Sequence, residues 1–324
     1  MQPAAPAVEE SSWQGCRTLR VPGGHLLCVI PVHTDPEVFA DVAQTWKVED
    51  QAGLQVAGVV ATKGGAVDLE LPSELSAGQR ELIVELAERN DADHADGLLG
   101  LVLSGSAARG MATERSDLDV YVVLTDDAAR GRRSTRSTSV DEIPVSLSEL
   151  ENVPPFASQG WSFAWAPTLL DRTSGRLPAA VRRQATLTPE ESDAVLVDHD
   201  RLDGWINYAY RALKSDRDDR RLERRLDAAE SMPWLLDVVF ALAGRVRPYH
   251  KYLPWELREH PLPHWPADVL LPLLARTLDG DPAAIRETFA RVRAGCAAYD
   301  AVRGHDYTRE VIDGWDDELL LFRE

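Results

Sequence analysis

The spacing of apolar residues divides the chain into a β-rich start, an α/β middle and a helical remainder. Apolar stretches interrupted by Pro-Gly-Gly and Gly-Gly predict strands and turns across residues 14–75. Within them, residues 35–50 predict a short helix, capped by Asp35 with Pro36 in its first turn. We therefore predict a β-rich N-terminal extension over residues 1–75, of which 1–12 form a disordered tail.

An α/β pattern follows over residues 76–160. An amphipathic helix begins after Ser76, which suits an N-cap. A buried strand then leads into a Gly-Ser turn and a short helical stretch. A second strand follows, and a polar, basic loop separates it from a third. These three strands are expected at residues 97–104, 117–124 and 142–150. This alternation predicts a small mixed β-sheet core.

Helical periodicity dominates residues 161–324. Three clear helices are expected at residues 204–215, 220–246 and 281–304, the last capped by Asp281 with Pro282 following it. Prolines between residues 254 and 272 break the intervening part into loops and short helices. The predicted fold class is α+β: the sheet core, a C-terminal α-helical bundle domain and the β-rich extension.

Charge and composition limit the classes of molecule that this protein is expected to bind. The formal net charge is −18, from 53 acidic and 35 basic side chains, so binding of nucleic acid is disfavoured. No apolar run is long enough to span a bilayer, and the first residues lack the features of a signal peptide. The three cysteines are widely spaced, which indicates neither a disulfide framework nor a zinc site. We expect a cytoplasmic protein without a membrane partner.

The candidate chemistry lies between residues 103 and 124. Gly105 and Ser106 form a small-residue turn between a strand and a short helix, and such turns present N–H groups and a hydroxyl to an anion. Asp117 and Asp119 are separated by one residue, so the period of a strand places both carboxylates on one face. Close carboxylates repel unless a cation lies between them, and Mg²⁺ prefers such ligands and bridges to phosphates. The alternative is a loop whose aspartates are merely solvated.

These motifs resemble those of the DNA polymerase β-like nucleotidyltransferase superfamily, which combines a Gly-Ser pair with Asp-x-Asp on the next strand. The resemblance covers about residues 78–150, and the Ala-Arg-Gly at 108–110 is similar to the bacterial antibiotic (aminoglycoside-type) and minimal nucleotidyltransferases. It implies that Asp117 and Asp119 are catalytic and bind metal, with two Mg²⁺ ions expected. Four residues are then expected to bind the nucleotide: Gly105, Ser106, Arg109 and Ser116.

Family members usually carry a third carboxylate on the strand after Asp-x-Asp. Here Val145 and Leu147 look core-facing, which leaves Ser146 where that acid is expected. A serine cannot replace an ionised carboxylate as a base or as an equal metal ligand. Three acids lie nearby, each requiring a register shift or a bulge: Asp141, Glu142 and Glu149. Full catalytic activity is therefore left open.

The helical region supplies further candidates. Some antibiotic-modifying members take their base from the helical domain, and Glu230 is the catalytic candidate here; its alternative is a surface acid paired with an arginine. Arg211 and Lys214 share a helix face suited to triphosphate oxygens, or form an ordinary solvated face. Tyr249 and Lys251 lie in a proline-broken aromatic stretch of the kind that lines substrate pockets.

The sequence thus predicts an Mg²⁺-dependent transferase that moves a nucleoside monophosphate from a nucleoside triphosphate to a hydroxyl of a small molecule. The acidic surface favours an aminoglycoside-like polycation. One alternative is a degenerate member that binds nucleotide or ligand without transfer, which Ser146 favours. Another is nucleotidylylation of a protein or tRNA acceptor. A homodimer is expected from relatives that share sites between subunits.

Overall fold

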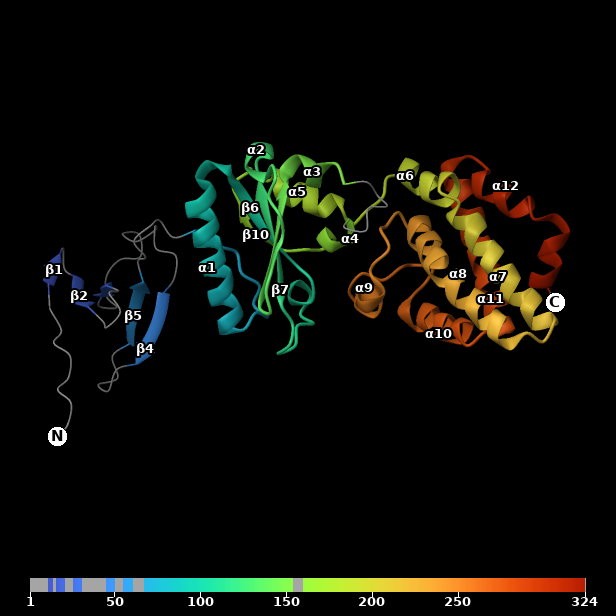
Figure 1. The fold of residues 1–324 in the computed structure, drawn as a ribbon, viewed down its shortest axis with the longest axis horizontal. Helices are drawn as coiled ribbons and strands as arrows, with labels where there is room; N and C mark the ends of the chain where they lie inside the picture. Colours follow the sequence, from blue (N-terminus) through green and yellow to red (C-terminus); the bar gives the residue numbers. More distant parts are fainter. Residues whose placement is uncertain are drawn as a thin grey trace, which may run out of the picture. The chain divides into compact units, whose positions relative to one another are not determined.

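The structure is a computed structural model of the chain. It describes residues 67–153 and 160–323 in full, and before them the backbone of five short strands. The chain forms two compact units, Met1–Ala95 and Asp96–Glu324. Figure 1 labels helices and strands of both. Each unit is described below by itself.

The first unit contains an antiparallel sheet and one long helix. Its strands follow the order β1-β2-β3-β5-β4 and span Ser11–Trp13 (β1), Cys16–Arg20 (β2), Leu26–Ile30 (β3), Thr45–Glu49 (β4) and Gln55–Val60 (β5). Helix α1 covers Ala77–His94, and Ser76 caps it in a capping box with Gln79. The predicted strands near 16–30 and 55–60 and the predicted cap at Ser76 are confirmed.

Two local predictions in this unit need correction. The helix expected over residues 35–50 is wrong for Thr45–Glu49, which forms β4 paired with β5. Alternation of Thr45, Lys47 and Glu49 with apolar residues suits the period of a strand, and pairing with β5 decides the outcome. The rest of that helix prediction, with its cap Asp35, lies outside the described residues. Residues 67–71, expected to be extended sheet, are irregular.

The second unit begins with a mixed five-stranded sheet in the order β10-β6-β7-β9-β8. Its strands are β6 (Leu98–Ser104), β7 (Leu118–Leu124), β8 (Thr135–Arg136), β9 (Val140–Ser146) and β10 (Thr168–Asp171). The β6–β7 pair is antiparallel, whereas β7 and β9 run parallel. The connection from β6 to β7 carries a short 3₁₀ helix, η3 (Ala107–Arg109). Strand β10 was not predicted and lies beyond residue 160, within the range that the sequence assigned to the helical domain.

One face of this sheet packs against short helices. Alternate residues of β7, Tyr121 and Val123, contribute to a buried apolar cluster with side chains of α3 (Leu147–Glu151), α4 (Gly160–Phe163) and α5 (Arg176–Arg183). Another short helix, α2 (Asp126–Ala129), follows β7. Because side chains alternate along a strand, every second residue of β7 and β9 lies on the same face of the sheet. At one end of the two strands this face packs into the apolar cluster. At the other end it carries acidic residues.

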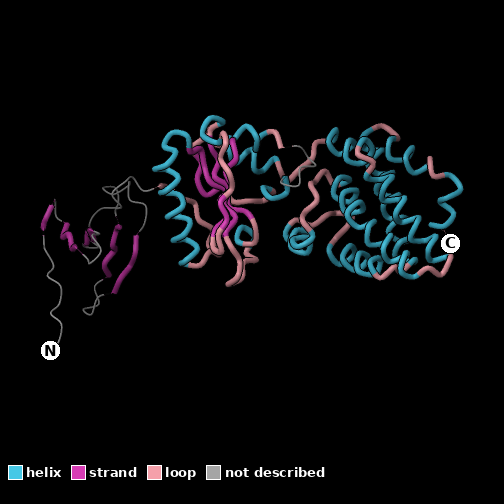
Figure 2. The backbone as a smooth tube through the Cα atoms, viewed as in Figure 1, coloured by secondary structure: helices cyan, strands magenta, loops and turns pink. Residues whose placement is uncertain are grey.

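The remainder of the chain is helical, as Figure 2 shows. Its elements are α6 (Pro189–Asp193), the π-helical turn η4 (Ala194–Asp198), α7 (Arg201–Arg217), α8 (Arg221–Leu242), η5 (His250–Tyr252), α9 (Leu253–Glu259), α10 (Ala267–Leu278), α11 (Pro282–Arg303), α12 (Tyr307–Asp313) and η6 (Asp316–Phe322). Helices α7, α8, α10 and α11 surround a core that includes Trp205, Phe240 and Val292. Asp281 caps α11 as predicted, by accepting a hydrogen bond from Ala283 N. The predicted α+β class, with a mixed sheet and a helical C-terminal region, is confirmed.

In the described part of the chain, no helix has the length and apolar character needed to span a membrane.

Candidate active site

The turn after β6 is built around a close approach between Gly105 and Asp119. Gly105 has φ +66°, a left-handed conformation that glycine adopts without strain. A Cβ added to it would lie 1.9 Å from Asp119 Oδ2, so the glycine leaves the space that this carboxylate occupies. The approach follows from the sheet register, because Ser104 is directly opposite Asp119 in the β6–β7 pair. The Gly-Ser turn and the second aspartate of Asp-x-Asp are thus neighbours in space.

Two further carboxylates surround Asp119. Asp117 immediately precedes β7, and Asp141 is the register partner of Asp119 across the parallel β7–β9 pair, so their side chains share one face. Burial is the main cause that raises the pKa of Asp119 above its ordinary value, followed by the charges of Asp117 and Asp141. The Lys251 ammonium and the Arg109 guanidinium oppose this rise. The face is therefore a concentration of negative charge, and a third cation, Arg136, lies with its Nε 3.6 Å from Asp141 Oδ2.

This register corrects the prediction for Ser146. Ser146 pairs with Leu124 at the far end of β9 and is the N-cap of α3, where it accepts a hydrogen bond from Glu149 N at 3.1 Å. The sequence argument treated core-facing positions as opposite to the acidic ones. In the structure Asp141, Ile143 and Val145 alternate along one face, which is acidic at its first end and apolar at the other. Asp141 thus stands beside Asp119 without a shift or a bulge.

The donor chemistry of this acidic edge fits a hard divalent cation. Asp117, Asp119 and Asp141 offer only carboxylate oxygens, the ligands that Mg²⁺ prefers. Their mutual repulsion, visible in the raised pKa of Asp119, is what a bound cation relieves. Within the described residues, no three His, Cys, Asp or Glu side chains already stand in an arrangement that could hold a metal ion.

The turn itself presents unused donors. Among the described residues, the backbone N–H groups of Gly105 and Ser106 have no hydrogen-bond acceptor, and neither does the Ser106 hydroxyl. The turn is closed from behind by Ser106 O, which accepts from Met111 N at 2.9 Å. Such a set of free N–H groups next to a strand end is suited to phosphate oxygens.

Arg109 and Ser116 take structural partners. The Arg109 side chain is buried and donates from Nη1 to Gly105 O at 2.8 Å and from Nη2 to Ala164 O at 3.0 Å. It supports the turn from inside. Ser116 Oγ accepts from Thr113 N at 3.0 Å and closes the loop before β7.

Lys251 and Tyr249 belong to the η5 segment, residues 249–253. The ammonium of Lys251 opposes the rise in the pKa of Asp119. Lys251 Nζ is 5.0 Å from the centre of the Tyr252 ring, a cation–π distance. The Tyr249 hydroxyl lies 2.9 Å from Ser162 Oγ. Both predicted substrate residues are therefore placed beside the α4 end of the sheet unit.

The other predicted cations and the predicted base lie in the helical bundle. Arg211 on α7 forms an ion pair with Asp227 on α8, with Nη2 to Oδ1 at 3.0 Å. Lys214 Nζ is 5.2 Å from the centre of the Tyr210 ring. Glu230 is exposed on α8, which begins nine residues before it and continues through Pro233. The recorded contacts of these residues are with the bundle.

A cavity of about 620 Å³ continues the acidic face towards α3 and α4. Tyr121 and Ile143 line it, and each stands two residues after an acid, Asp119 and Asp141 respectively. The other lining residues mix apolar and polar groups: Ser134, Pro144, Val145, Ser148, Glu149, Asn152, Val153 and Phe163. A molecule in this cavity would lie along the strands that carry the acids.

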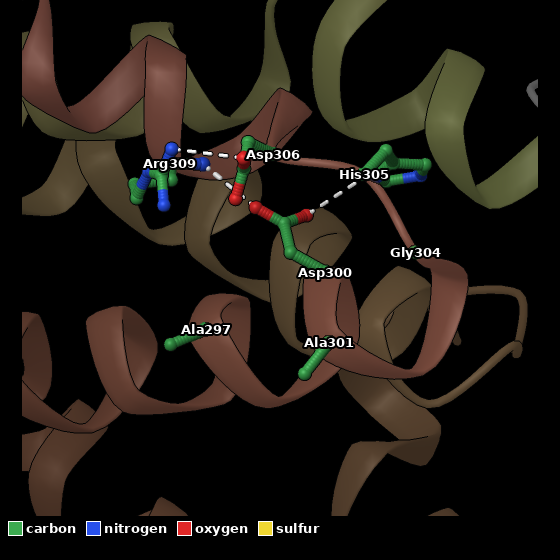
Figure 3. A pocket seen from close by; sticks show the side chains of 7 residues that line it. All are labelled: Ala297, Asp300, Ala301, Gly304, His305, Asp306 and Arg309. Carbon is green, nitrogen blue, oxygen red and sulfur yellow. Dashed lines mark hydrogen bonds and ion pairs between the residues drawn. The ribbon is translucent and has the colours of Figure 1, made fainter.

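A second cavity, of about 420 Å³, lies between the end of α11 and the start of α12 (Figure 3). The carboxylate of Asp300 accepts hydrogen bonds from Thr308 N at 3.3 Å and Arg309 N at 2.9 Å. His305 Nδ1 lies 3.4 Å from the same carboxylate. Because these contacts fasten the turn between two helices, the polar groups here are used by the fold.

Comparisons with known proteins identify the domain that holds the acidic edge. No curated protein has a detectably similar sequence. Among solved structures, the chain is similar to a nucleotidyltransferase-like protein from Exiguobacterium sibiricum 255-15, with 12% identity and a TM-score of 0.31, over 69% of this chain and 78% of that chain. The family model described as a nucleotidyltransferase domain matches residues 83–162. Together with the Gly-Ser turn and the Asp-x-Asp strand, this match identifies residues 83–162 as a nucleotidyltransferase domain of the DNA polymerase β-like superfamily.

Proposed function

We propose that this protein transfers a nucleoside monophosphate from an Mg²⁺-bound nucleoside triphosphate to a hydroxyl of a small molecule. The observation that carries the proposal is the juxtaposition of Asp119 with both the Gly105 turn and Asp141. A phosphate-binding turn and a paired set of carboxylates at one strand end are what phosphoryl transfer requires.

The triphosphate tail is assigned to the turn. The free N–H groups of Gly105 and Ser106, with the Ser106 hydroxyl, would receive phosphate oxygens. Lys251, whose ammonium opposes the rise in the pKa of Asp119, would neutralise charge on the same tail. Roles in phosphate binding for Arg211 and Lys214 stay predictions.

Asp117, Asp119 and Asp141 would hold Mg²⁺, which when bound supplies charge neutralisation of the triphosphate. In the transfer, the acceptor oxygen forms a bond to the α-phosphorus while the bond from that phosphorus to the bridging oxygen breaks, and pyrophosphate leaves. The proton of the acceptor hydroxyl passes to a carboxylate base. Asp141 is our candidate because it lies on the acidic face beside Asp119. Glu230, exposed on α8, remains the alternative predicted from the sequence.

The cavity beside Tyr121 and Ile143 supports a small acceptor, since about 620 Å³ is the size of a typical small-molecule site. The net charge of −18 favours a cationic acceptor such as an aminoglycoside-like antibiotic. The alternative of a non-transferring binder rests on Ser146 at the third carboxylate position, and Asp141 beside Asp119 weakens that argument. A protein or tRNA acceptor is a further alternative.

The test is incubation of the purified protein with each α-³²P-labelled nucleoside triphosphate, Mg²⁺ and a panel of hydroxylated small molecules that includes aminoglycosides. We expect a labelled product of low mass and equimolar pyrophosphate, both lost in Asp117→Asn. Label on protein or tRNA from a lysate would redirect the proposal to a macromolecular acceptor. Binding of Mg·ATP by calorimetry without pyrophosphate from any acceptor would support the non-transferring alternative.

A further inference from the structure

We propose that Arg109 is a positioning residue that ties the phosphate-binding turn to the segment carrying Lys251. The inference rests on the proposed function for what the turn and Lys251 bind, but the tie itself is a property of the unliganded protein. At one end, the Arg109 guanidinium donates to the carbonyl of Gly105, the central residue of the turn. At the other end, it stacks on aromatic rings that belong to the segment around Lys251.

The aromatic end is formed by residues far apart in the sequence. The guanidinium carbon of Arg109 lies 4.2 Å from the ring centre of Trp161, 5.0 Å from Tyr252 and 5.7 Å from Trp255. Tyr252 ends η5, directly after Lys251, and Trp255 follows on α9. Trp161 and Tyr252 also stack on each other, with ring centres 5.0 Å apart. One side chain therefore contacts both the turn and the η5 segment.

A second set of bonds repeats the same connection. Ser162 O accepts hydrogen bonds from Ser104 Oγ at 2.7 Å and from Arg109 Nη2 at 3.4 Å. The hydroxyl of Ser162 lies 2.9 Å from that of Tyr249, at the start of the η5 segment. The end of β6, Arg109 and the η5 segment thus converge on the short helix α4.

The surroundings of Arg109 are unusual for a cation. Only 5% of its surface is exposed, and burial lowers its pKa. Among the residues that the structure describes, its Nε has no hydrogen-bond partner, and its guanidinium contacts carbonyls and rings. Burying a charged group there costs free energy unless the group is hydrogen-bonded. Arginine suits the position because its planar guanidinium can donate to several carbonyls while its face stacks on a ring. Lysine would keep the charge without that geometry.

The consequence for the site is specific. Lys251 directly precedes Tyr252, and the Arg109 guanidinium carbon lies 5.0 Å from the centre of the Tyr252 ring. Without Arg109, the turn and Lys251 would lose their fixed relation, and the two would no longer meet the same triphosphate. Arg109 itself touches neither substrate nor metal in this proposal.

The first test uses hydrogen exchange of the unliganded protein. Arg109→Gln and Arg109→Lys are compared with Arg115→Gln, which removes an exposed cation from the same loop. We expect faster exchange in both Arg109 variants at residues 105–110 and at residues 249–253, with no change at either segment in Arg115→Gln. Loosening of only one of the two segments would overturn the proposal, whatever the protein catalyses. Arg109→Lys serves as the readable variant if Arg109→Gln does not fold.

The second test is a double-mutant cycle with Arg109→Lys and Lys251→Ala, read as the Kd for Mg·ATP by calorimetry. If Arg109 acts by placing Lys251, then Lys251→Ala raises the Kd by about tenfold in the wild type and by less than about twofold in Arg109→Lys. Equal effects in both backgrounds would mean that Arg109 is only structural, and would overturn the proposal. Absence of Mg·ATP binding by the folded wild type would instead refute the proposed function. The hydrogen-exchange result would still show whether Arg109 connects the turn to the η5 segment.

Discussion

The α-carbon of Gly105 faces the carboxylate of Asp119, with space for a hydrogen and none for a methyl group. This contact predicts the outcome of Gly105→Ala. The added Cβ would meet Asp119 Oδ2 at 1.9 Å, and φ of +66° is itself unfavourable for alanine by about 1–2 kcal/mol. We expect a loss of transfer of at least about 100-fold, because the metal-binding carboxylate must move. Labelled-product formation and thermal unfolding measure the two effects.

Gly131→Ala is the matched control for this prediction. Gly131 has φ +74°, but no atom of the described residues lies within 4 Å of a Cβ built on it. It therefore carries the backbone cost without the clash. Similar destabilisation with normal transfer is expected; equal loss of activity in both variants would show that strain alone explains the effect.

We expect Asp119→Asn to increase the stability of the protein and to abolish most of the dependence of its Tm on Mg²⁺. The pKa of Asp119 is raised above its ordinary value of 3.8 by burial and by neighbouring carboxylates, so its ionised form is penalised in the folded state. Stability from this group is present below pH 3.8 and is lost as the pH rises through the raised pKa. At neutral pH without metal, we expect Asp119→Asn to be more stable than the wild type, because the amide carries no charge among the neighbouring carboxylates. Thermal unfolding at pH 7.5 measures this difference.

Mg²⁺ provides the second readout of the same variant. A cation bound among the carboxylates stabilises the folded wild type, so its Tm should rise with Mg²⁺ concentration. The midpoint of this rise should shift to higher Mg²⁺ as the pH falls towards the pKa of Asp119, because protons compete with the metal. Asp119→Asn should lose most of the shift. A wild-type Tm that is insensitive to Mg²⁺ and nucleotide together would contradict the assignment.

Asp141 and Ser146 should respond in opposite ways to substitution. Asp141→Asn removes a carboxylate beside Asp119 and should lower kcat by about 10²- to 10⁴-fold while the fold is kept. Ser146→Ala removes the cap of α3 and should cost about 1 kcal/mol of stability with little change in kcat. Steady-state kinetics and thermal unfolding of the two variants decide the matter. Glu230→Gln is measured in parallel. If kcat falls strongly in Glu230→Gln and is unchanged in Asp141→Asn, the general base is Glu230 on α8.

The contrast between these two residues shows where sequence reasoning succeeds and where it stops. The caps at Ser76 and Asp281 were predictable because the cap and its partner lie within three residues of each other. The Gly-Ser turn and Asp-x-Asp were also recognisable, since each motif is a local pattern. The position of Asp141 depends on the register between β7 and β9, which are joined by a connection of fifteen residues, 125–139. Burial of Val145 does not determine which face carries the acids.

Strand β4 and the contacts of Arg109 also depend on residues that are distant in the sequence. The sequence of β4 permits a helix or a strand, and pairing with β5 selects the strand. Arg109 lies in the family motif and donates to Gly105 O, and its other partners come from residues 161–164 and 252–255. No local pattern predicts aromatic rings from so far along the chain.

Lys251 and Arg211 provide a final comparison between two cations proposed for the triphosphate. Lys251 acts on Asp119 electrostatically, whereas the Arg211 guanidinium is 3.0 Å from the carboxylate of Asp227. Lys251→Ala should therefore raise KM for the nucleotide by about tenfold, consistent with loss of one charge-assisted contact worth about 1.5 kcal/mol. Arg211→Ala should raise it clearly less, because its charge is already compensated. The salt dependence of KM separates the two further: it should weaken in Lys251→Ala, since a cation that meets phosphate is lost. A larger effect of Arg211→Ala would instead place the triphosphate against α7.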